Sequence, residues 1–123
     1  MTIKEFYAQI GEDDQDVVKR LGSEALIRRL ILKFPQDETF AALQEALEQQ
    51  NTETAFRAAH TLKGVAVNLG FTRLYHAAAA LTEVLRAAKL AEAAPLLAET
   101  ETAYRKIINA ISALTSDLKC DTT

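Results

Sequence analysis

The sequence predicts an all-α fold, an antiparallel up-down-up-down four-helix bundle with additional short helices at its N-terminus. Apolar residues recur every three or four positions through most of the 123 residues, and no segment shows the alternation typical of strands. Aromatic residues make up 7 % and tryptophan is absent, while alanine and leucine are abundant, which favours helices over sheets. We expect a single domain over residues 1–123, with the bundle at about 36–117 and the N-terminal helices at about 2–34.

Capping residues and glycines divide the N-terminal segment into three short helices. A threonine followed three residues later by a glutamate resembles a capping box, and glycines are suited to the first position beyond a helix. A proline then ends the third helix or begins the next one, since proline is tolerated in a first turn. In chain order the cap and stop residues are Thr2 with Glu5, Gly11, Asp13 or Asp14, Gly22, Ser23 and Pro35.

Four longer helices follow, at about 36–50, 52–69, 72–89 and from about 92 onward. Asn51 is a good N-cap for the second of them and Gly70 a good stop. Connections of only a few residues favour antiparallel neighbours. The polar tail, 117–123, is expected to fray. The apolar stripes of the first, third and fourth helices are Phe40, Leu43 and Leu47; Leu74, Ala78, Leu81 and Leu85; and Leu97, Tyr104, Ile107, Ile108, Ile111 and Leu114.

The composition argues against several classes of protein. The net charge of −3 is unlike that of a nucleic-acid binder, which usually carries a basic stripe. The single cysteine, Cys120, supports neither an internal disulfide nor a cysteine-based zinc site. The N-terminus lacks the apolar core of a signal peptide, and no apolar run approaches the roughly 20 residues that span a bilayer. We therefore expect a cytoplasmic protein without nucleic-acid or membrane partners, and a monomer because the stripes leave no second apolar face.

The helix after Asn51 carries a histidine on its polar side. Lys63 lies one turn beyond that histidine, and the next position is a glycine, which costs a helix interior about 1 kcal/mol relative to alanine. A reactive side chain, a cation and a bare stretch of backbone together suggest a docking place for another macromolecule. The predicted apolar stripe is Phe56, Ala59, Leu62, Ala66 and Leu69, and the opposite face is Arg57, His60, Gly64 and Val67.

These residue types suit phosphoryl transfer. A neutral imidazole offers a nucleophilic nitrogen near neutral pH, because the unperturbed pKa of histidine is about 6.5. A phosphoryl group on His60 would carry close to two negative charges, which Lys63 at i+3 and Arg57 at i−3 are placed to offset. Gly64 at i+4 leaves space where a side chain would block the backbone or phosphoryl group of a partner.

The segment His60-Thr61-Leu62-Lys63-Gly64, with Gly70 ten residues after the histidine, closely resembles the motif of the histidine phosphotransfer (HPt) domain family. The resemblance covers essentially the whole chain and is most specific over residues 56–85. That family consists of four-helix bundles that shuttle phosphoryl groups between a histidine and the aspartates of response-regulator receiver domains. It lacks kinase activity and ATP binding, so the resemblance implies a phosphocarrier and not an enzyme.

The resemblance also implies roles for individual residues. His60 would be the phosphoacceptor, through its Nε2, with Lys63 as the phosphate-side cation and Gly64 as clearance for the receiver. Some members hold the histidine with a glutamine on the following helix. The matching residue is Thr82, whose shorter side chain leaves open how the tautomer of His60 is fixed.

The implied partners are a response-regulator receiver domain, a sensor histidine kinase, or both. The chain would need no cofactor of its own, because the magnesium ion belongs to the receiver. It has no room for a kinase or receiver domain, so we expect a stand-alone module or a part of a larger hybrid protein.

Two alternative functions fit the sequence less well. A non-transferring module that only binds receivers remains open, although the intact His60, Lys63 and Gly64 argue against it. A di-iron bundle requires inward-pointing Glu-x-x-His pairs. Arginines stand three residues before both histidines, and no metal is expected.

Three other residues have less specific interpretations. Arg57 is better explained by a plain surface charge than by a phosphate contact. His76 falls on the polar face of its helix as a solvated histidine. Val67 extends the His60 face and is unusual as an exposed apolar residue, so it is a candidate for a hydrophobic docking patch.

Overall fold

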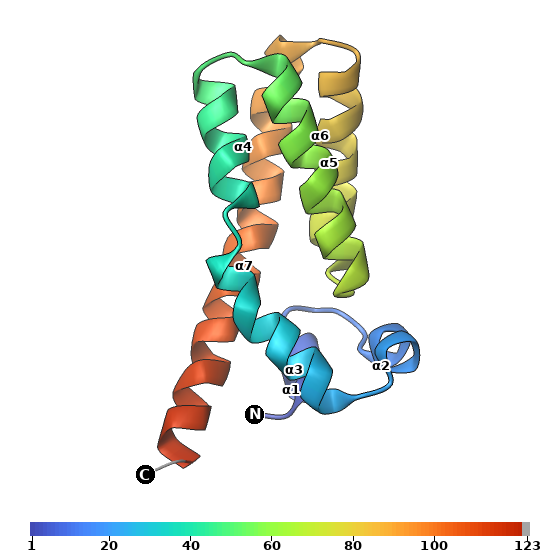
Figure 1. Ribbon diagram of the computed structural model, residues 1–123, viewed down its shortest axis with the longest axis vertical. Helices are drawn as coiled ribbons and strands as arrows, with labels where there is room; N and C mark the ends of the chain where they lie inside the picture. The colour runs from blue at the N-terminus through green and yellow to red at the C-terminus, as the bar shows by residue number, and fades with distance from the viewer. Residues whose placement is uncertain (122–123) are drawn as a thin grey trace.

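The computed structural model describes residues 1–121, and side chains for residues 1–116. Its upper part is a bundle of four helices that lie side by side, with consecutive helices antiparallel (Figure 1). They are α4 (Thr39–Glu48), α5 (Thr52–Asn68), α6 (Thr72–Arg86) and α7 (Ala93–Asp121). The all-α bundle predicted from the sequence is confirmed. No helix in the described part of the chain has the length and apolar character needed to cross a membrane.

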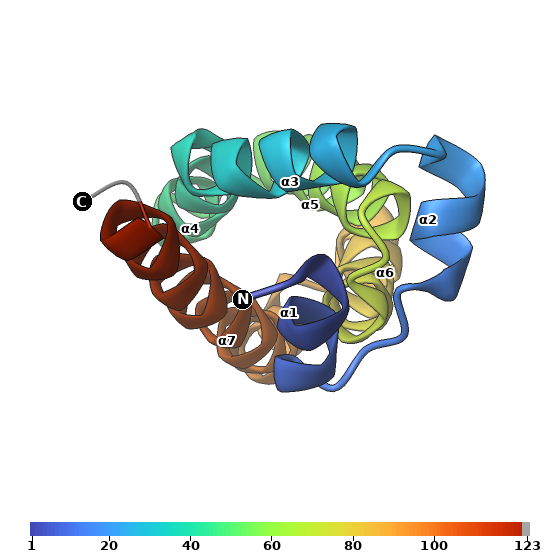
Figure 2. The ribbon, with the colours of Figure 1, turned by 90° about the horizontal axis from the view of Figure 1, so that it is seen from below.

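Three short helices lie across the lower end of the bundle (Figures 1 and 2). They are α1 (Ile3–Gln9), α2 (Gln15–Leu21) and α3 (Glu24–Lys33). The capping box of α1 is present, because Thr2 Oγ1 accepts from the Glu5 N–H at 3.0 Å and Glu5 Oε1 accepts from the Thr2 N–H at 3.2 Å. Ser23 caps α3 by accepting from the Leu26 N–H at 3.2 Å. Both predicted caps are confirmed.

An aromatic cluster joins the short helices to the bundle. Phe6 and Phe34 pack edge-on against Phe71, with ring centroids 6.3 and 5.3 Å apart. The buried Tyr7 hydroxyl donates to the Leu69 carbonyl at 2.6 Å. Burial, with a smaller contribution from the Asp14 carboxylate, raises the pKa of Tyr7 above its ordinary value. The lower end of α5 is therefore held by apolar packing and a buried hydrogen bond.

Several helix ends differ from the predicted ones. A 3-10 turn, η1 (Phe34–Gln36), contains Pro35 and delays the start of α4 to Thr39. Helix α6 ends at Arg86, three residues before the expected Lys89, and a left-handed residue, Ala88, with φ 57°, follows it.

The prediction that the tail frays from Asp117 onward is also corrected. Helix α7 continues to Asp121, and the residues it adds include neither glycine nor proline to interrupt it. The Cys120 side chain and the last two threonines lie outside the described residues.

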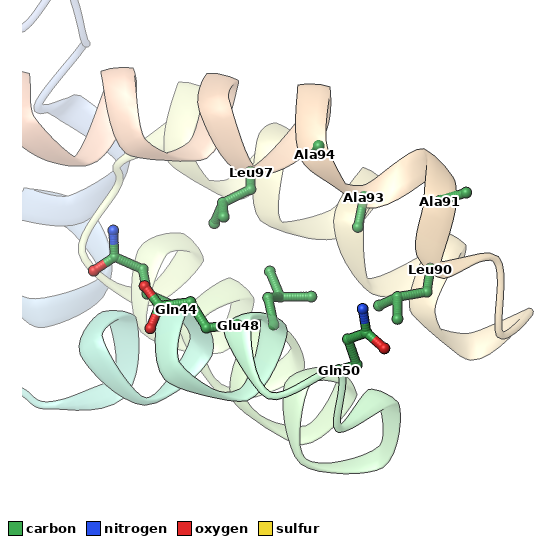
Figure 3. A pocket seen from close by; sticks show the side chains of 9 residues that line it. Gln44, Glu48, Gln50, Leu90, Ala91, Ala93, Ala94 and Leu97 are labelled. Carbon is green, nitrogen blue, oxygen red and sulfur yellow. The ribbon is translucent and has the colours of Figure 1, made fainter.

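Helices α4 and α7 are in contact at one end of the bundle and lie farther apart at the other. Phe40 stacks on Tyr104 with ring centroids 4.2 Å apart. Toward the opposite end of the bundle the helices leave a groove of about 550 Å³ (Figure 3). Leu47 and Leu97, predicted as stripe residues, are only half-buried and line this groove. The other lining residues come from α4, the loop after it, η2 (Leu90–Glu92) and α7, so the groove is separate from His60 on α5.

Candidate functional site

Helix α5, which carries His60, begins and ends where the sequence predicts. The Asn51 side chain accepts from the Thr54 N–H at 3.1 Å and caps its N-terminus. Gly70 follows its C-terminus with φ 73°, a left-handed conformation that favours glycine. A Cβ at Gly70 would also overlap the Val17 Cγ2 methyl group of α2. The close approach of α2 is therefore a second reason for glycine at this position.

Helix α2 is attached to the end of α5 by Arg20. Its Nη2 donates to the carbonyl oxygens of Val67 and Asn68, both at 3.1 Å. The last carbonyl groups of a helix lack partners within the helix and form the negative end of its dipole, so a guanidinium stabilises them. The Arg20 Nε also pairs with Asp16 at 2.9 Å, which keeps the guanidinium in place.

The face of α5 predicted to be exposed is exposed. His60, Gly64, Arg57 and Val67 all lie on the surface, and Val67 has half of its surface, 50 %, in contact with solvent. The predicted apolar stripe is confirmed at four positions, Ala59, Leu62, Ala66 and Leu69, which are all buried.

The prediction is wrong at one position of the stripe. Ala55 occupies the core, while Phe56 is only half-buried. Its ring lies at the edge of the core beside His60. The two rings are nearly parallel, with an interplanar angle of 17° and centroids 6.2 Å apart. The phenyl ring expected in the interior therefore belongs to the surroundings of the histidine.

The imidazole of His60 is held by no polar contact within the described part of the chain. None of the described side chains or backbone groups forms a hydrogen bond or ion pair with it. Thr82, the candidate support, does not provide one: it is fully buried, and its hydroxyl donates to the Ala78 carbonyl at 2.7 Å. That hydrogen bond stays within α6. The ring nitrogens of His60 are consequently free to react with a partner.

Two cations flank the histidine on α5, and they differ in their partners. Arg57 pairs with Glu53 at 2.6 Å, and both side chains are largely exposed, 73 % and 74 %. Lys63 is half-buried and forms no ion pair with any described residue. Lys63 therefore has no acidic partner among the described residues, whereas Arg57 has Glu53. This difference favours Lys63 as the cation available to an incoming phosphoryl group.

Gly64 occupies an ordinary helical position with open space around it. A Cβ built there meets no atom within 4 Å, and the residue does not have a positive φ. Neither backbone conformation nor close packing inside this chain requires glycine. The described residues therefore give no structural reason for glycine at this position, which lies one turn from His60.

Sequence reasoning missed two neighbours of the site. Arg86, the last residue of α6, places its Cζ 5.2 Å from the centroid of the Phe56 ring, and it pairs with Glu83 at 3.4 Å. Arg20 was likewise not expected near α5. Arg86 and Arg20 each contact a helix other than their own, so local sequence gave no indication of these contacts. Phe56 differs, because its place four residues before His60 indicates that the two side chains are neighbours on α5.

The structure is a helical bundle with an exposed histidine, His60, on the outer face of α5. A family model described as Hpt domain matches residues 36–116, more than half of the chain. The chain therefore belongs to the Hpt domain family, which gives it a histidine phosphotransfer role in a phosphorelay. Members are phosphocarriers and generally interact with receiver domains and kinases of two-component systems. Comparisons with curated proteins and with solved structures found no match.

Proposed function

We propose that this protein is a phosphorelay intermediate that carries the phosphoryl group on His60. It accepts the group from a receiver-domain aspartate, or from a kinase, and passes it to the aspartate of a response regulator. One observation supports this most strongly: an exposed imidazole, to which no described residue makes a polar contact, stands one turn from Gly64, where an added Cβ would meet open space. An exposed histidine next to unobstructed backbone suits reaction with a docked protein.

The transfer is an in-line displacement. The lone pair of the His60 Nε2 attacks the phosphorus of the aspartyl phosphate, and the P–O bond to the aspartate breaks. The carboxylate leaves with the bonding electrons, and the imidazole gains the phosphoryl group and a positive charge. The reverse reaction returns the group to a receiver. The acidic pocket and magnesium ion belong to the receiver, and this chain contributes position and charge.

The three site residues have separate tasks in this step. His60 supplies the nucleophile, and Lys63 supplies a positive charge beside the phosphoryl oxygens. Gly64 lets the partner approach. Val67 extends the apolar contact surface along the same face of α5, and Arg57 contributes a weaker positive charge at the opposite end because Glu53 already pairs with it.

Phosphoryl transfer from a labelled receiver domain tests the proposal directly. We expect an acid-labile, alkali-stable label on the wild type and none on His60→Gln. His76→Gln is the matched control, because His76 is the second histidine and is also exposed, on α6. Label on His60→Gln would refute the assignment. Binding of receivers to the wild type without any label would instead favour the alternative, a non-transferring interaction module.

A further inference from the structure

The ring of Phe56 and the guanidinium of Arg86 form an aromatic shelf beside His60, and we propose that this shelf positions the imidazole for phosphoryl transfer. Phe56 and His60 are four residues apart on α5, so they lie on neighbouring turns of one face. Arg86 reaches Phe56 from the end of α6. The inference rests on the proposed function, since it names the residues that orient the same histidine.

The need for such a shelf follows from the absence of other restraints. An exposed side chain normally samples several rotamers, and a nucleophile that must attack in line loses rate when its orientation varies. The described residues provide no hydrogen bond to either nitrogen of His60, and the Thr82 hydroxyl is used within its own helix. The parallel contact with Phe56 is therefore the interaction that restrains the plane of the imidazole.

The placement of Phe56 is unusual for a residue that only fills the core. The next residue toward the N-terminus, Ala55, is fully buried, whereas the much larger Phe56 is only partly buried. Aromatic pairs with centroids between 4.5 and 7 Å attract each other beyond the burial of their surface, and the separation of 6.2 Å from His60 falls in this range. Phe56 thus packs against the edge of the core and presents a flat surface to the histidine.

Arg86 supplies the guanidinium of the shelf. Its Cζ lies 5.2 Å from the centroid of Phe56, within the roughly 6 Å over which a cation is attracted to a ring. The pair with Glu83 at 3.4 Å keeps the arginine on this side of α6. Because α5 and α6 are antiparallel, this contact ties the first half of α5 to the last turn of α6. It makes Arg86 a positioning residue that acts through Phe56.

Replacing the ring while preserving an apolar side chain tests the shelf. With saturating labelled receiver, we expect Phe56→Leu to transfer about twofold to tenfold more slowly, and Phe56→Tyr, which keeps the ring, to match the wild type. Arg86→Gln should be about twofold to fivefold slower, and it should leave the fold intact because the side chain is exposed. The receiver affinity should stay unchanged in all three variants.

Matched controls remove similar contacts elsewhere. Tyr104→Leu loses an aromatic stack, with Phe40, and Arg105→Gln loses an ion pair, with Glu101 at 2.8 Å. Both lie on α7, away from the shelf, and should transfer at the wild-type rate. The proton resonances of the His60 ring should move in Phe56→Leu, because the ring current of the neighbouring phenyl group is lost, and stay in place in Tyr104→Leu; this checks that the two rings are neighbours in solution, and the transfer rates test the positioning role.

The outcomes separate the two proposals. A wild-type rate in both Phe56→Leu and Arg86→Gln, or a change confined to receiver affinity, would overturn the positioning role and leave the phosphocarrier function intact. Absence of label on the wild type, from receivers and from phosphoramidate, would overturn the phosphocarrier function and the positioning role with it. Slower transfer with unchanged affinity, restored by Phe56→Tyr, would support the shelf.

Discussion

Substituting Gly64 by alanine should make the protein more stable and less active. The added Cβ meets no atom of this chain within 4 Å, so it introduces no clash in the free protein. Alanine in place of a helical glycine reduces the conformational freedom of the unfolded chain and stabilises by about 0.4–1 kcal/mol. For a domain of this size, that corresponds to a rise in Tm of about 2–4 °C.

The same methyl group should obstruct the partner. Residues four apart on a helix have Cβ atoms about 5–6 Å from each other, so the new methyl would stand that close to the Cβ of His60. A receiver that must bring its phosphorus within bonding distance of the imidazole would be displaced. Because a misplacement of about 1 Å can cost roughly a hundredfold in rate, we expect transfer to Gly64→Ala to slow by about tenfold to a hundredfold.

Two measurements check this prediction. Thermal unfolding gives the change in stability, and transfer from a labelled receiver gives the rate. Phosphoramidate, a small phosphoryl donor that needs no docked protein, is the control and should label Gly64→Ala at the wild-type rate. If Gly64→Ala were less stable than the wild type, the added methyl group would clash with the chain, which would contradict the open space found around the glycine. Full transfer activity from the receiver would refute the clearance role.

Four further substitutions test other parts of the structure. Lys63→Gln should slow transfer from a receiver by about threefold to tenfold, and Arg57→Gln by less than Lys63→Gln, because Glu53 already offsets the arginine; equal effects in the rate assay would contradict the distinction. Gly70→Ala should destabilise by about 2–4 kcal/mol in denaturant titrations, from its left-handed backbone and the overlap with Val17. Tyr7 contributes stability that is fully present below about pH 10, its unfolded pKa, and is lost as pH rises toward its raised folded pKa. Tyr7→Phe should therefore lose less stability than the wild type when Tm is followed from about pH 8 to pH 11.

The order of the helices and the exposed face of α5 could be predicted because both depend on local patterns. Caps such as Thr2, Ser23 and Asn51 act within three residues of themselves, and the 3.6-residue period fixes which side chains share a face. The exposure of His60 needed no information about the rest of the chain.

The positions that the sequence did not predict depend on packing between helices. Ala55 and Phe56 are adjacent at the edge of the stripe, and the directions of α4 and α6 decide which of them is covered. The spacing of three residues to Ala59 predicts Phe56 as the stripe residue, and the structure buries Ala55. The contacts of Arg20 and Arg86 with α5 likewise require helices that are distant in sequence to be side by side.

Helix ends were missed for a different reason. Gln50 and Ala88 adopt φ values of 56° and 57°, in the left-handed region where glycine or asparagine is usual. Neither residue type marks such a position in a sequence, so the end of α6 was placed at Lys89 instead of Arg86.

Helix α5 is capped at its ends and carries a glycine in the middle, where we propose that the partner approaches. The loss of stability at Gly64, about 1 kcal/mol, is similar to the contribution of the Asn51 cap. The two residues are separated by about 20 Å along the helix axis, so their effects on stability should add. The double variant Asn51→Ala/Gly64→Ala should then unfold near the wild-type temperature and still accept phosphate as slowly as Gly64→Ala. Recovery of the transfer rate in the double variant would mean that Gly64 acts through the stability of α5, and not through the space it leaves beside His60.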